Sequence, residues 1–125
     1  MTSTVVIADD DVDIRALVRI SAVRAGLNVV AEAGNGNEAL SAIRLLVPEL
    51  AILDVSMPGL SGLEVCRLVR ADSALDGVQV LLVSAAADET SIAAGMRAGA
   101  ADYLSKPFSP RELASRLSAH VGGTR

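Results

Sequence analysis

The stretch AILDVSMPGLSG, residues 51–62, joins a run of apolar side chains to an acid and then to a turn. The apolar residues Leu50–Leu53 are typical of a buried strand, and this strand ends at the carboxylate of Asp54. Pro58 and Gly59 follow, and both residue types favour a turn. An acid at the tip of a buried strand needs a physical reason, because charged side chains are rarely buried without a partner.

Short apolar runs of the same kind recur along the chain. Two of them are nearly continuous in Val, Ile and Leu, which is typical of strands covered on both faces of a parallel sheet. The runs are TVVIA (4–8), NVVAEA (28–33), ELAILD (49–54), VQVLLVS (78–84) and ADYLS (101–105). Segments with helical periodicity lie between them, so a strand–helix unit repeats about five times. This alternation predicts an α/β fold with a doubly wound, five-stranded parallel sheet and helices on both faces.

The helical segments contain residues that mark their apolar faces and their ends. The second, from about residue 37 to Pro48, places Leu40, Ile43 and Val47 on one apolar face. SGLE at 61–64 and SPRE at 109–112 predict capping boxes at the third and fifth helices. The fourth helix, about 88–98, has few large apolar side chains and contains Gly95, which costs about 1 kcal/mol relative to alanine. We therefore expect the fourth helix to be the least firmly docked.

Composition limits the possible classes of function. The 125 residues fit one domain, expected over 1–121, with 122–125 as a tail or the start of a linker. The net charge is −4 and no basic cluster is present, so we expect no direct nucleic-acid binding. A single cysteine, Cys66, excludes an internal disulfide framework and favours a reducing cytoplasm. No signal peptide is recognisable, and no run approaches the roughly 18 apolar residues of a membrane span.

Several polar side chains fall where the predicted strands end. Asp9 and Asp10 follow the first strand, Asp54 and Ser84 end the third and fourth, and Lys106 lies just past the fifth. Because ligands of such sheets bind at the carboxyl ends of the strands, we expect these groups to converge at one edge.

The converging groups predict a metal-assisted phosphoryl site. Clustered carboxylates repel one another, and Mg²⁺, which prefers oxygen ligands, removes that cost. Lys106 and Ser84 suit the oxygens of a phosphoryl group, one as a point charge and the other as a hydrogen-bond donor. Asp54 is then the nucleophile that receives this group. Asp11, next to the pair of acids, is better explained as a helix cap than as a ligand.

The chain resembles the receiver domains of two-component response regulators. Four motifs match in order: ADDD at 8–11, LDVSMPGLSG at 53–62, VSA at 83–85 and YLSKPF at 103–108. The resemblance covers nearly the whole chain and implies the flavodoxin-like strand order 2-1-3-4-5. The segment ADYLSKPFSPREL is most similar to receivers joined to winged-helix DNA-binding domains. The resemblance therefore leaves two readings open: a stand-alone receiver, or a receiver tethered to a C-terminal effector domain outside this chain.

The resemblance also implies roles for single residues. Asp54 would be phosphorylated by a histidine kinase or by a small acyl phosphate. Asp10 and Asp54 would coordinate Mg²⁺, with Asp9 acting through water and the backbone carbonyl of Ser56 as a further ligand. The protein would be an acceptor that dephosphorylates itself, not an enzyme that turns over external substrates.

A second set of residues would convert phosphorylation into an output. Lys106 would contact the phosphoryl group, with a cis bond between Lys106 and Pro107. Ser84 and Tyr103 would form a switch pair, and we expect Tyr103 to turn inward from an exposed orientation when Ser84 moves. The change would reach the face formed by the fourth helix, fifth strand and fifth helix.

The same face bears on oligomerisation. Asp102, Glu112 and Arg116 resemble charges that winged-helix regulators use there for pairing, but Ile92 and Ala101 occupy positions that are usually charged. We therefore expect a monomer, or a weak dimer that depends on phosphorylation.

Other functions remain open from the residues. A phosphohydrolase with an aspartate nucleophile needs a general acid to protonate the leaving group. In the haloacid-dehalogenase-like family this acid stands two residues after the nucleophile. Ser56 occupies that position here, and a serine cannot serve as the acid at neutral pH. A flavodoxin-like carrier would bind its phosphate after the first strand, where Asp9–Asp11 would repel it. A pseudo-receiver that binds partners without phosphorylation is the remaining alternative.

Overall fold

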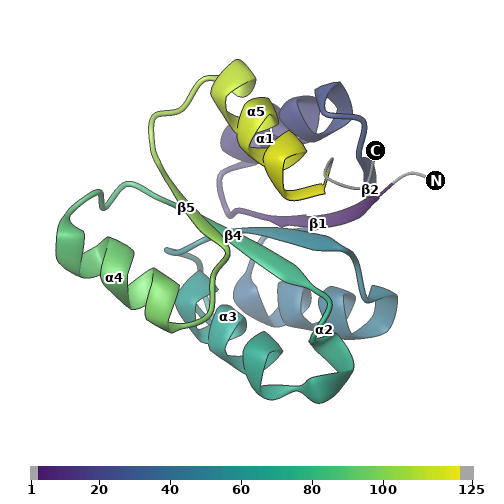
Figure 1. Ribbon diagram of the computed structural model, residues 1–125, viewed down its shortest axis with the longest axis vertical. Helices are drawn as coiled ribbons and strands as arrows, with labels where there is room; N and C mark the ends of the chain where they lie inside the picture. The colour runs from purple at the N-terminus through teal and green to yellow at the C-terminus, as the bar shows by residue number, and fades with distance from the viewer. Residues whose placement is uncertain (1–2, 122–125) are drawn as a thin grey trace.

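Five parallel strands form one sheet in the computed structural model, which describes residues 3–121 (Figure 1). The strands are β1 (Thr4–Ala8), β2 (Asn28–Ala33), β3 (Leu50–Asp54), β4 (Gln79–Ser84) and β5 (Asp102–Ser105). Their order across the sheet is β2-β1-β3-β4-β5, and every neighbouring pair is parallel. The predicted fold class and strand order are confirmed.

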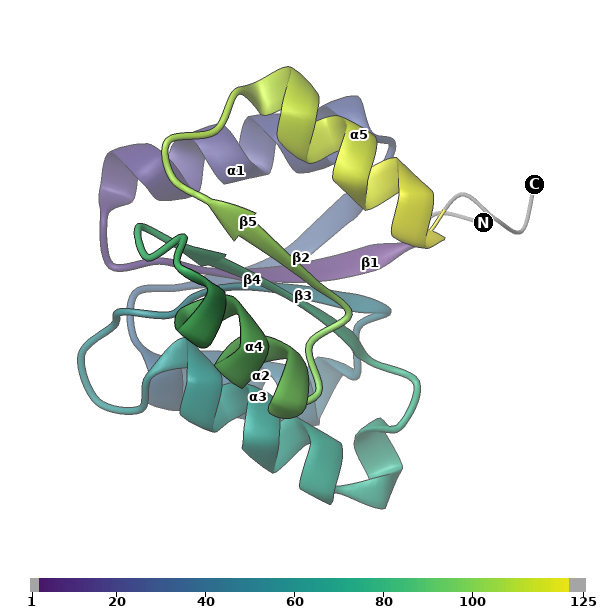
Figure 2. The same cartoon turned by 60° about the vertical axis from the view of Figure 1, so that its left-hand side comes forward.

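Helices cover both faces of the sheet. Within residues 3–121 they are α1 (Val12–Arg24), α2 (Gly36–Leu46), α3 (Gly62–Ala71), α4 (Glu89–Arg97) and α5 (Pro110–Val121), with a short 3-10 helix η1 (Ser73–Leu75) after α3. Helices α1 and α5 lie side by side on one face, and α2, α3 and α4 lie on the other (Figures 1 and 2). Over the same residues, no helix combines the length and the apolar character needed to cross a membrane.

Each face of the sheet carries its own apolar layer. On β1, Val5 and Ile7 pack on the side of α1 and α5, and Val6 and Ala8 pack on the opposite side. This alternation follows from the two-residue period of a strand. All five residues of β3 are buried. A central strand covered on both faces has no exposed position for a polar side chain, which explains the continuous apolar run before Asp54.

Helix α2 differs from the prediction at its C-terminus. Leu40 and Ile43 are buried as predicted, but Val47 is 50% exposed, so its predicted inward orientation is wrong. The helix ends at Leu46, and Val47 adopts the left-handed conformation with φ 44°. One left-handed residue often ends a helix, although glycine usually occupies that position. This change of backbone direction takes the Val47 side chain off the apolar face.

The predicted capping boxes form completely at α3 and by half at α5. Ser61 Oγ accepts a hydrogen bond from the Glu64 N–H at 3.1 Å, and Glu64 Oε1 accepts one from the Ser61 N–H at 2.9 Å. At α5, Ser109 Oγ accepts from the Glu112 N–H at 3.0 Å, with Pro110 as the first helical residue. Within the described residues, the return bond to the Glu112 side chain is not made. Helix α5 therefore begins with one fewer capping bond than α3.

Helix α4 has Gly95 as its only buried residue, which agrees with the expected light docking. A Cβ atom on Gly95 would lie 2.8 Å from Cδ2 of Tyr103 and 3.1 Å from Cδ1 of Leu82. Sequence reasoning treated Gly95 only as a weak point of the helix. In the structure it also lies against Leu82 of β4 and Tyr103 of β5, at a distance that a side chain would prevent.

Candidate functional site

Four strands bring the predicted site residues to the carboxyl edge of the sheet. Asp9 follows β1, Asp54 and Ser84 are the last residues of β3 and β4, and Lys106 follows β5 directly. Asp9, Asp54 and Ser84 are buried, whereas Asp10 is exposed. The site therefore has a buried floor and one carboxylate open to solvent.

Three carboxylates and one ammonium group meet at this edge. One oxygen from each of Asp9, Asp10 and Asp54 lies within 4.8 Å of the other two. Lys106 Nζ lies 3.2 Å from Oδ2 of Asp9 and 3.3 Å from Oδ1 of Asp54. Lys106 thus contacts two of the three clustered carboxylates, and the remaining negative charge fits a hard divalent cation with oxygen ligands.

The environment of Asp54 favours its neutral form. Burial, and next to it the nearby carboxylate of Asp9, raise the pKa of Asp54, and the Lys106 ammonium lowers it without cancelling the rise, so that the pKa lies at about 6. For Lys106, burial lowers the pKa, but the carboxylates of Asp54 and Asp9 outweigh it and hold the pKa above its ordinary value. At neutral pH Asp54 is ionised, as an attacking carboxylate must be.

The loop between β1 and α1 orders the acids by local hydrogen bonds. Asp9 Oδ1 accepts from the N–H of Asp11 at 2.9 Å. The Asp11 side chain in turn accepts from the N–H groups of Asp13 and Ile14, at 2.9 and 3.2 Å. Asp11 is therefore the N-cap of α1, as expected, and not a member of the acid cluster.

The turn after β3 folds back on the main chain that carries Asp54. Gly59 has φ 73°, a conformation that side chains disfavour. A Cβ atom on Gly62 would lie 2.3 Å from the carbonyl oxygen of Asp54. Ser56 lies in the exposed part of this turn, and the approach of its carbonyl to a metal stays a prediction. Beyond β5, the peptide bond between Lys106 and Pro107 is cis.

Ser84 and Tyr103, the predicted switch pair, are linked through the main chain of Ala86. The Ala86 N–H donates to Ser84 Oγ at 3.0 Å, and the Tyr103 hydroxyl donates to the Ala86 carbonyl oxygen at 2.7 Å. Both side chains also line a pocket of about 130 Å³. Tyr103 is half-buried against Gly95, so the exposed starting orientation that we expected is wrong. Its hydroxyl already has a partner on the loop after Ser84.

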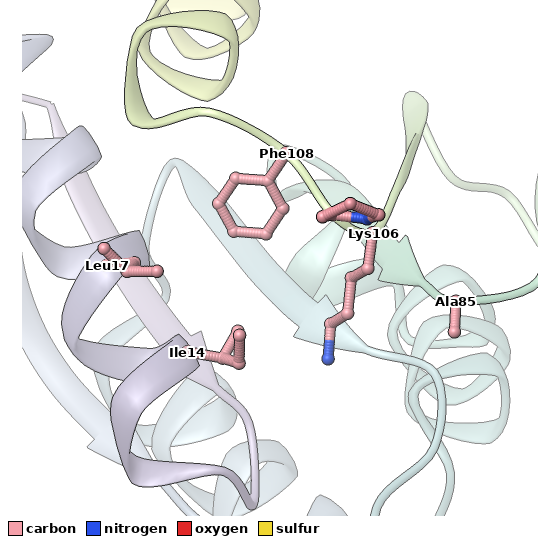
Figure 3. A pocket seen from close by; sticks show the side chains of 6 residues that line it. Ile14, Leu17, Ala85, Lys106 and Phe108 are labelled. Carbon is pink, nitrogen blue, oxygen red and sulfur yellow. The ribbon is translucent and has the colours of Figure 1, made fainter.

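A larger pocket of about 330 Å³ lies next to the acid cluster, and Lys106 is the only one of the predicted site residues Asp9, Asp10, Asp54, Ser84 and Lys106 that lines it. Figure 3 shows Phe108 facing Ile14 and Leu17 of α1 across this pocket, with Lys106 and Ala85 on its other side. The lining is mostly apolar. The pocket is therefore a surface beside the site, and it lacks the oxygen ligands that a metal requires.

Sequence reasoning missed two groups that hold the site together. Arg15 Nη1 donates to the carbonyl oxygen of Asp9 at 2.8 Å, and the main chain of Ala86 joins the switch pair. Arg15 precedes the buried Val18 by three residues, so a charge on the inward face of a helix was the available signal. No side-chain pattern could reveal Ala86, because only its N–H and carbonyl groups take part.

Comparison with known families identifies the architecture around this site. The family model for the response regulator receiver domain matches residues 5–118. The chain belongs to this family. As a receiver domain of two-component response regulators it is a signalling protein and not a turnover enzyme, and no observation favours the pseudo-receiver alternative. The domain expected over 1–121 contains the matched region, while the tail expected at 122–125 lies outside the described residues.

Individual relatives agree with this assignment. The receiver domain is 37% identical over 121 residues to the DNA-binding response regulator MtrA of Mycobacterium tuberculosis, which covers 97% of this chain and 51% of MtrA. The chain thus spans about half the length of the curated relatives it matches.

Two solved structures are similar over nearly the whole chain. The signal receiver domain of the response regulator NarL from Mycobacterium tuberculosis has a TM-score of 0.89 and 32% identity, and the alignment covers 98% of both chains. The beryllofluoride-activated receiver domain of DrrB, from Thermotoga maritima, has a TM-score of 0.87 and 28% identity, and the alignment covers 98% of this chain and 99% of that one.

Proposed function

We propose that this receiver domain is a switch in which Asp54 accepts a phosphoryl group in a Mg²⁺-dependent reaction. The donor is the phosphohistidine of a histidine kinase or a small acyl phosphate. The observation that carries the proposal is the meeting of Asp54 with two other carboxylates and with Lys106, whose Nζ lies 3.3 Å from Asp54 Oδ1. A structural ion pair would need neither the third carboxylate nor the position at the end of a strand.

The reaction is a displacement at phosphorus. An oxygen of Asp54 attacks and forms a new O–P bond, while the P–N bond of phosphohistidine, or the P–O bond of the acyl phosphate, breaks. The electron pair leaves with the imidazole nitrogen or with the acyl carboxylate. Lys106 and the hydroxyl of Ser84 bind oxygens of the transferred group and hold it in place. Later attack by water on the phosphorus atom breaks the bond to the Asp54 oxygen, releases inorganic phosphate and returns the Asp54 carboxylate.

The acid cluster supplies the metal ligands in this proposal. Asp10 and Asp54 would bind the ion directly, Asp9 would bind it through water, and the carbonyl of Ser56 would be a further ligand. The buried floor and the exposed Asp10 leave an accessible side for waters, which Mg²⁺ usually keeps. When bound, Mg²⁺ would supply the positive charge that offsets the negative charge of the transferred phosphoryl group.

The output begins at Ser84. When its hydroxyl turns to the phosphoryl group, it gives up the hydrogen bond from the Ala86 N–H, and the Ala86 main chain is then free to move. Because the Ala86 carbonyl accepts from the Tyr103 hydroxyl, that movement reaches β5 and α4. A local charge thereby biases a distant surface, as a phosphorylation switch requires.

The partners follow from this scheme. They are a cognate histidine kinase and an effector domain like those of DNA-binding relatives, which also favours the cytoplasm as the location. DNA contact would fall to the effector, because this chain carries a net charge of −4.

Asp102 already pairs within the chain, at 2.7 Å from Arg116 Nη1 and 3.1 Å from His120 Nε2. A pairing across a dimer would have to replace these contacts, which supports a monomer or a weak, phosphorylation-dependent dimer.

Intact-mass spectrometry tests the proposed reaction. With Mg²⁺ and acetyl phosphate, the wild-type protein should gain one phosphoryl group, and the Asp54→Asn variant should gain none. Omission of Mg²⁺ should abolish labelling of the wild type. Equal labelling of Asp54→Asn would place the acceptor elsewhere and overturn the proposal.

A further inference from the structure

Arg15 on α1 reaches the main chain directly behind the acid cluster. Its Nη1 donates to the carbonyl oxygen of Asp9 at 2.8 Å and, more weakly, to that of Ala33 at 3.4 Å. Its Nε lies 3.3 Å from Oε1 of Glu32 on β2, and the side chain is only 22% exposed. One guanidinium group therefore connects the end of β1, the end of β2 and a carboxylate.

These contacts fix the peptide that carries the acids. The Asp9 carbonyl belongs to the peptide bond that leads into Asp10, so a hydrogen bond to that oxygen restricts how the plane of this peptide rotates. The Asp9 N–H is held as well, because it donates to the Ala33 carbonyl at 3.0 Å. With both sides of Asp9 fixed, the directions of the Asp9 and Asp10 side chains are constrained.

The neighbouring backbone leaves space for this arrangement. A Cβ atom on Gly34 would lie 3.3 Å from Arg15 Nη1, closer than an ordinary van der Waals contact. Glu32 also receives Arg19 Nε, at 3.4 Å from its second carboxylate oxygen, so the acid is held from two sides. Arg15 Nη1 is thereby directed toward the two carbonyl oxygens while Nε faces Glu32, which suits the rigid arrangement of donors on a guanidinium group.

We propose that Arg15 is the positioning residue of the metal-binding carboxylates: through the Asp9 carbonyl it sets the spacing of Asp9 and Asp10 relative to Asp54. The proposal rests on the proposed function, because it assumes that this cluster binds Mg²⁺. Arg15 touches neither the metal nor the phosphoryl group. It acts as outer partners of metal ligands do, by orienting the groups that bind.

The charge and the position of Arg15 have opposite consequences for metal affinity. A cation near the cluster repels Mg²⁺, so loss of its charge alone should tighten Mg²⁺ binding. Loss of its hydrogen bonds to the loop should weaken binding instead. Arg19 is the matched control, because it carries the same charge on the same helix, pairs with the same Glu32, and has no contact with Asp9 or Ala33 among the described residues.

Calorimetric titration with Mg²⁺ separates these effects in Arg15→Ala, Arg15→Lys and Arg19→Ala. We expect Arg15→Ala to raise the Kd for Mg²⁺ by about tenfold or more, which is typical for loss of an outer partner of a metal ligand. Arg15→Lys should lie between it and the wild type, because lysine keeps the charge but not the fork. Arg19→Ala should bind as the wild type does, or slightly more tightly.

A second readout needs no metal. In Mg²⁺-free protein, Arg15→Ala should speed hydrogen exchange at the amides of Asp9 and Asp11, which the ordered loop protects, and Arg19→Ala should leave both rates unchanged.

The outcomes distinguish this inference from the proposed function. A wild-type protein that fails to bind Mg²⁺ would refute the function and the inference together. A wild type that binds, with an Arg15→Ala variant of equal or tighter affinity, would overturn the role of Arg15 alone. If Arg15→Ala does not fold, Arg15→Lys decides, and wild-type affinity in that variant would count against the inference.

Discussion

At the scale of single residues, the neighbours of Asp54 shift its pKa in opposite directions, and the result affects both the stability of the fold and the reactivity of this carboxyl group. Burial and Asp9 favour its protonated form, and Lys106 favours its ionised form. The balance leaves the pKa at about 6, above its ordinary value of 3.8. A carboxylate that is costly to ionise is one that gains from a bound cation.

The raised pKa predicts that Asp54→Asn stabilises the Mg²⁺-free protein at neutral pH. Between pH 3.8 and about 6 the folded state holds a proton on Asp54 that the unfolded state has lost, so wild-type stability falls as pH rises through this window. The stability of Asp54→Asn does not fall in this way, because asparagine has no proton to lose in this pH range. Urea unfolding should show it to be more stable by roughly 1–3 kcal/mol above pH 6, with the difference vanishing below about pH 4. If the two proteins differ in their free energy of unfolding by the same amount below pH 4 and above pH 6, the pKa of Asp54 is not raised by folding.

Residues whose side chains carry the chemistry could be predicted from the sequence, and residues that act through the main chain could not. Asp54, Ser84 and Lys106 each end or follow an apolar run, and parallel strands bring such positions to one edge. Ala86 contributes only an N–H and a carbonyl group, which every residue has. Arg15 has a charged side chain, but its partner is a carbonyl that the sequence does not mark.

At the scale of elements, α4 packs on the sheet through a residue that has no side chain. Its only buried residue is Gly95, and the Tyr103 ring occupies the space that a methyl group would need. Sequence reasoning recognised the low helix propensity of Gly95, which is a local property. It missed the packing of Tyr103, because that contact joins segments that only the tertiary fold brings together.

Gly95→Ala therefore tests how α4 is coupled to the site. Helix propensity alone would make this change stabilising by about 1 kcal/mol. The added methyl group would instead displace the Tyr103 ring and break its hydrogen bond to Ala86, so we expect at least about fivefold weaker binding of beryllofluoride in the presence of Mg²⁺. Gly77→Ala is the control, because a Cβ atom there meets nothing within 4 Å. Unchanged beryllofluoride affinity in Gly95→Ala would mean that Tyr103 is not coupled to Asp54.

At the scale of the whole molecule, the strand order creates the acid cluster. Strands β1 and β3 are neighbours at the centre of the sheet, and Ala8 pairs with Leu53 in their register. The residues that follow, Asp9 and Asp54, therefore leave adjacent strands side by side, about 4.8 Å apart. The alternation of strands and helices predicts a parallel sheet, but the register that aligns these two acids depends on long-range pairing that the sequence does not specify.

The repulsion within the cluster predicts that Mg²⁺ raises the thermal stability of the protein. A ligand that binds only the folded state at 100 times its Kd adds about 2.7 kcal/mol to the free energy of unfolding. The melting temperature should rise accordingly in thermal unfolding followed by circular dichroism, and Asp10→Asn should show a much smaller rise. Asp76→Asn, a change of equal charge near the start of β4, should respond as the wild type does. An undiminished rise in Asp10→Asn would place the cation elsewhere.

Tyr103, whose ring lies on Gly95 and whose hydroxyl is bonded to Ala86, is the only tyrosine of a chain that has no tryptophan. The intrinsic ultraviolet emission of the protein therefore comes from one side chain, and that side chain belongs to the switch pair. Emission from tyrosine depends on the partner of its hydroxyl, so beryllofluoride should change the signal of the unlabelled wild type and leave that of Asp54→Asn constant. The domain thus contains its own optical probe, which allows activation to be followed in real time without a dye.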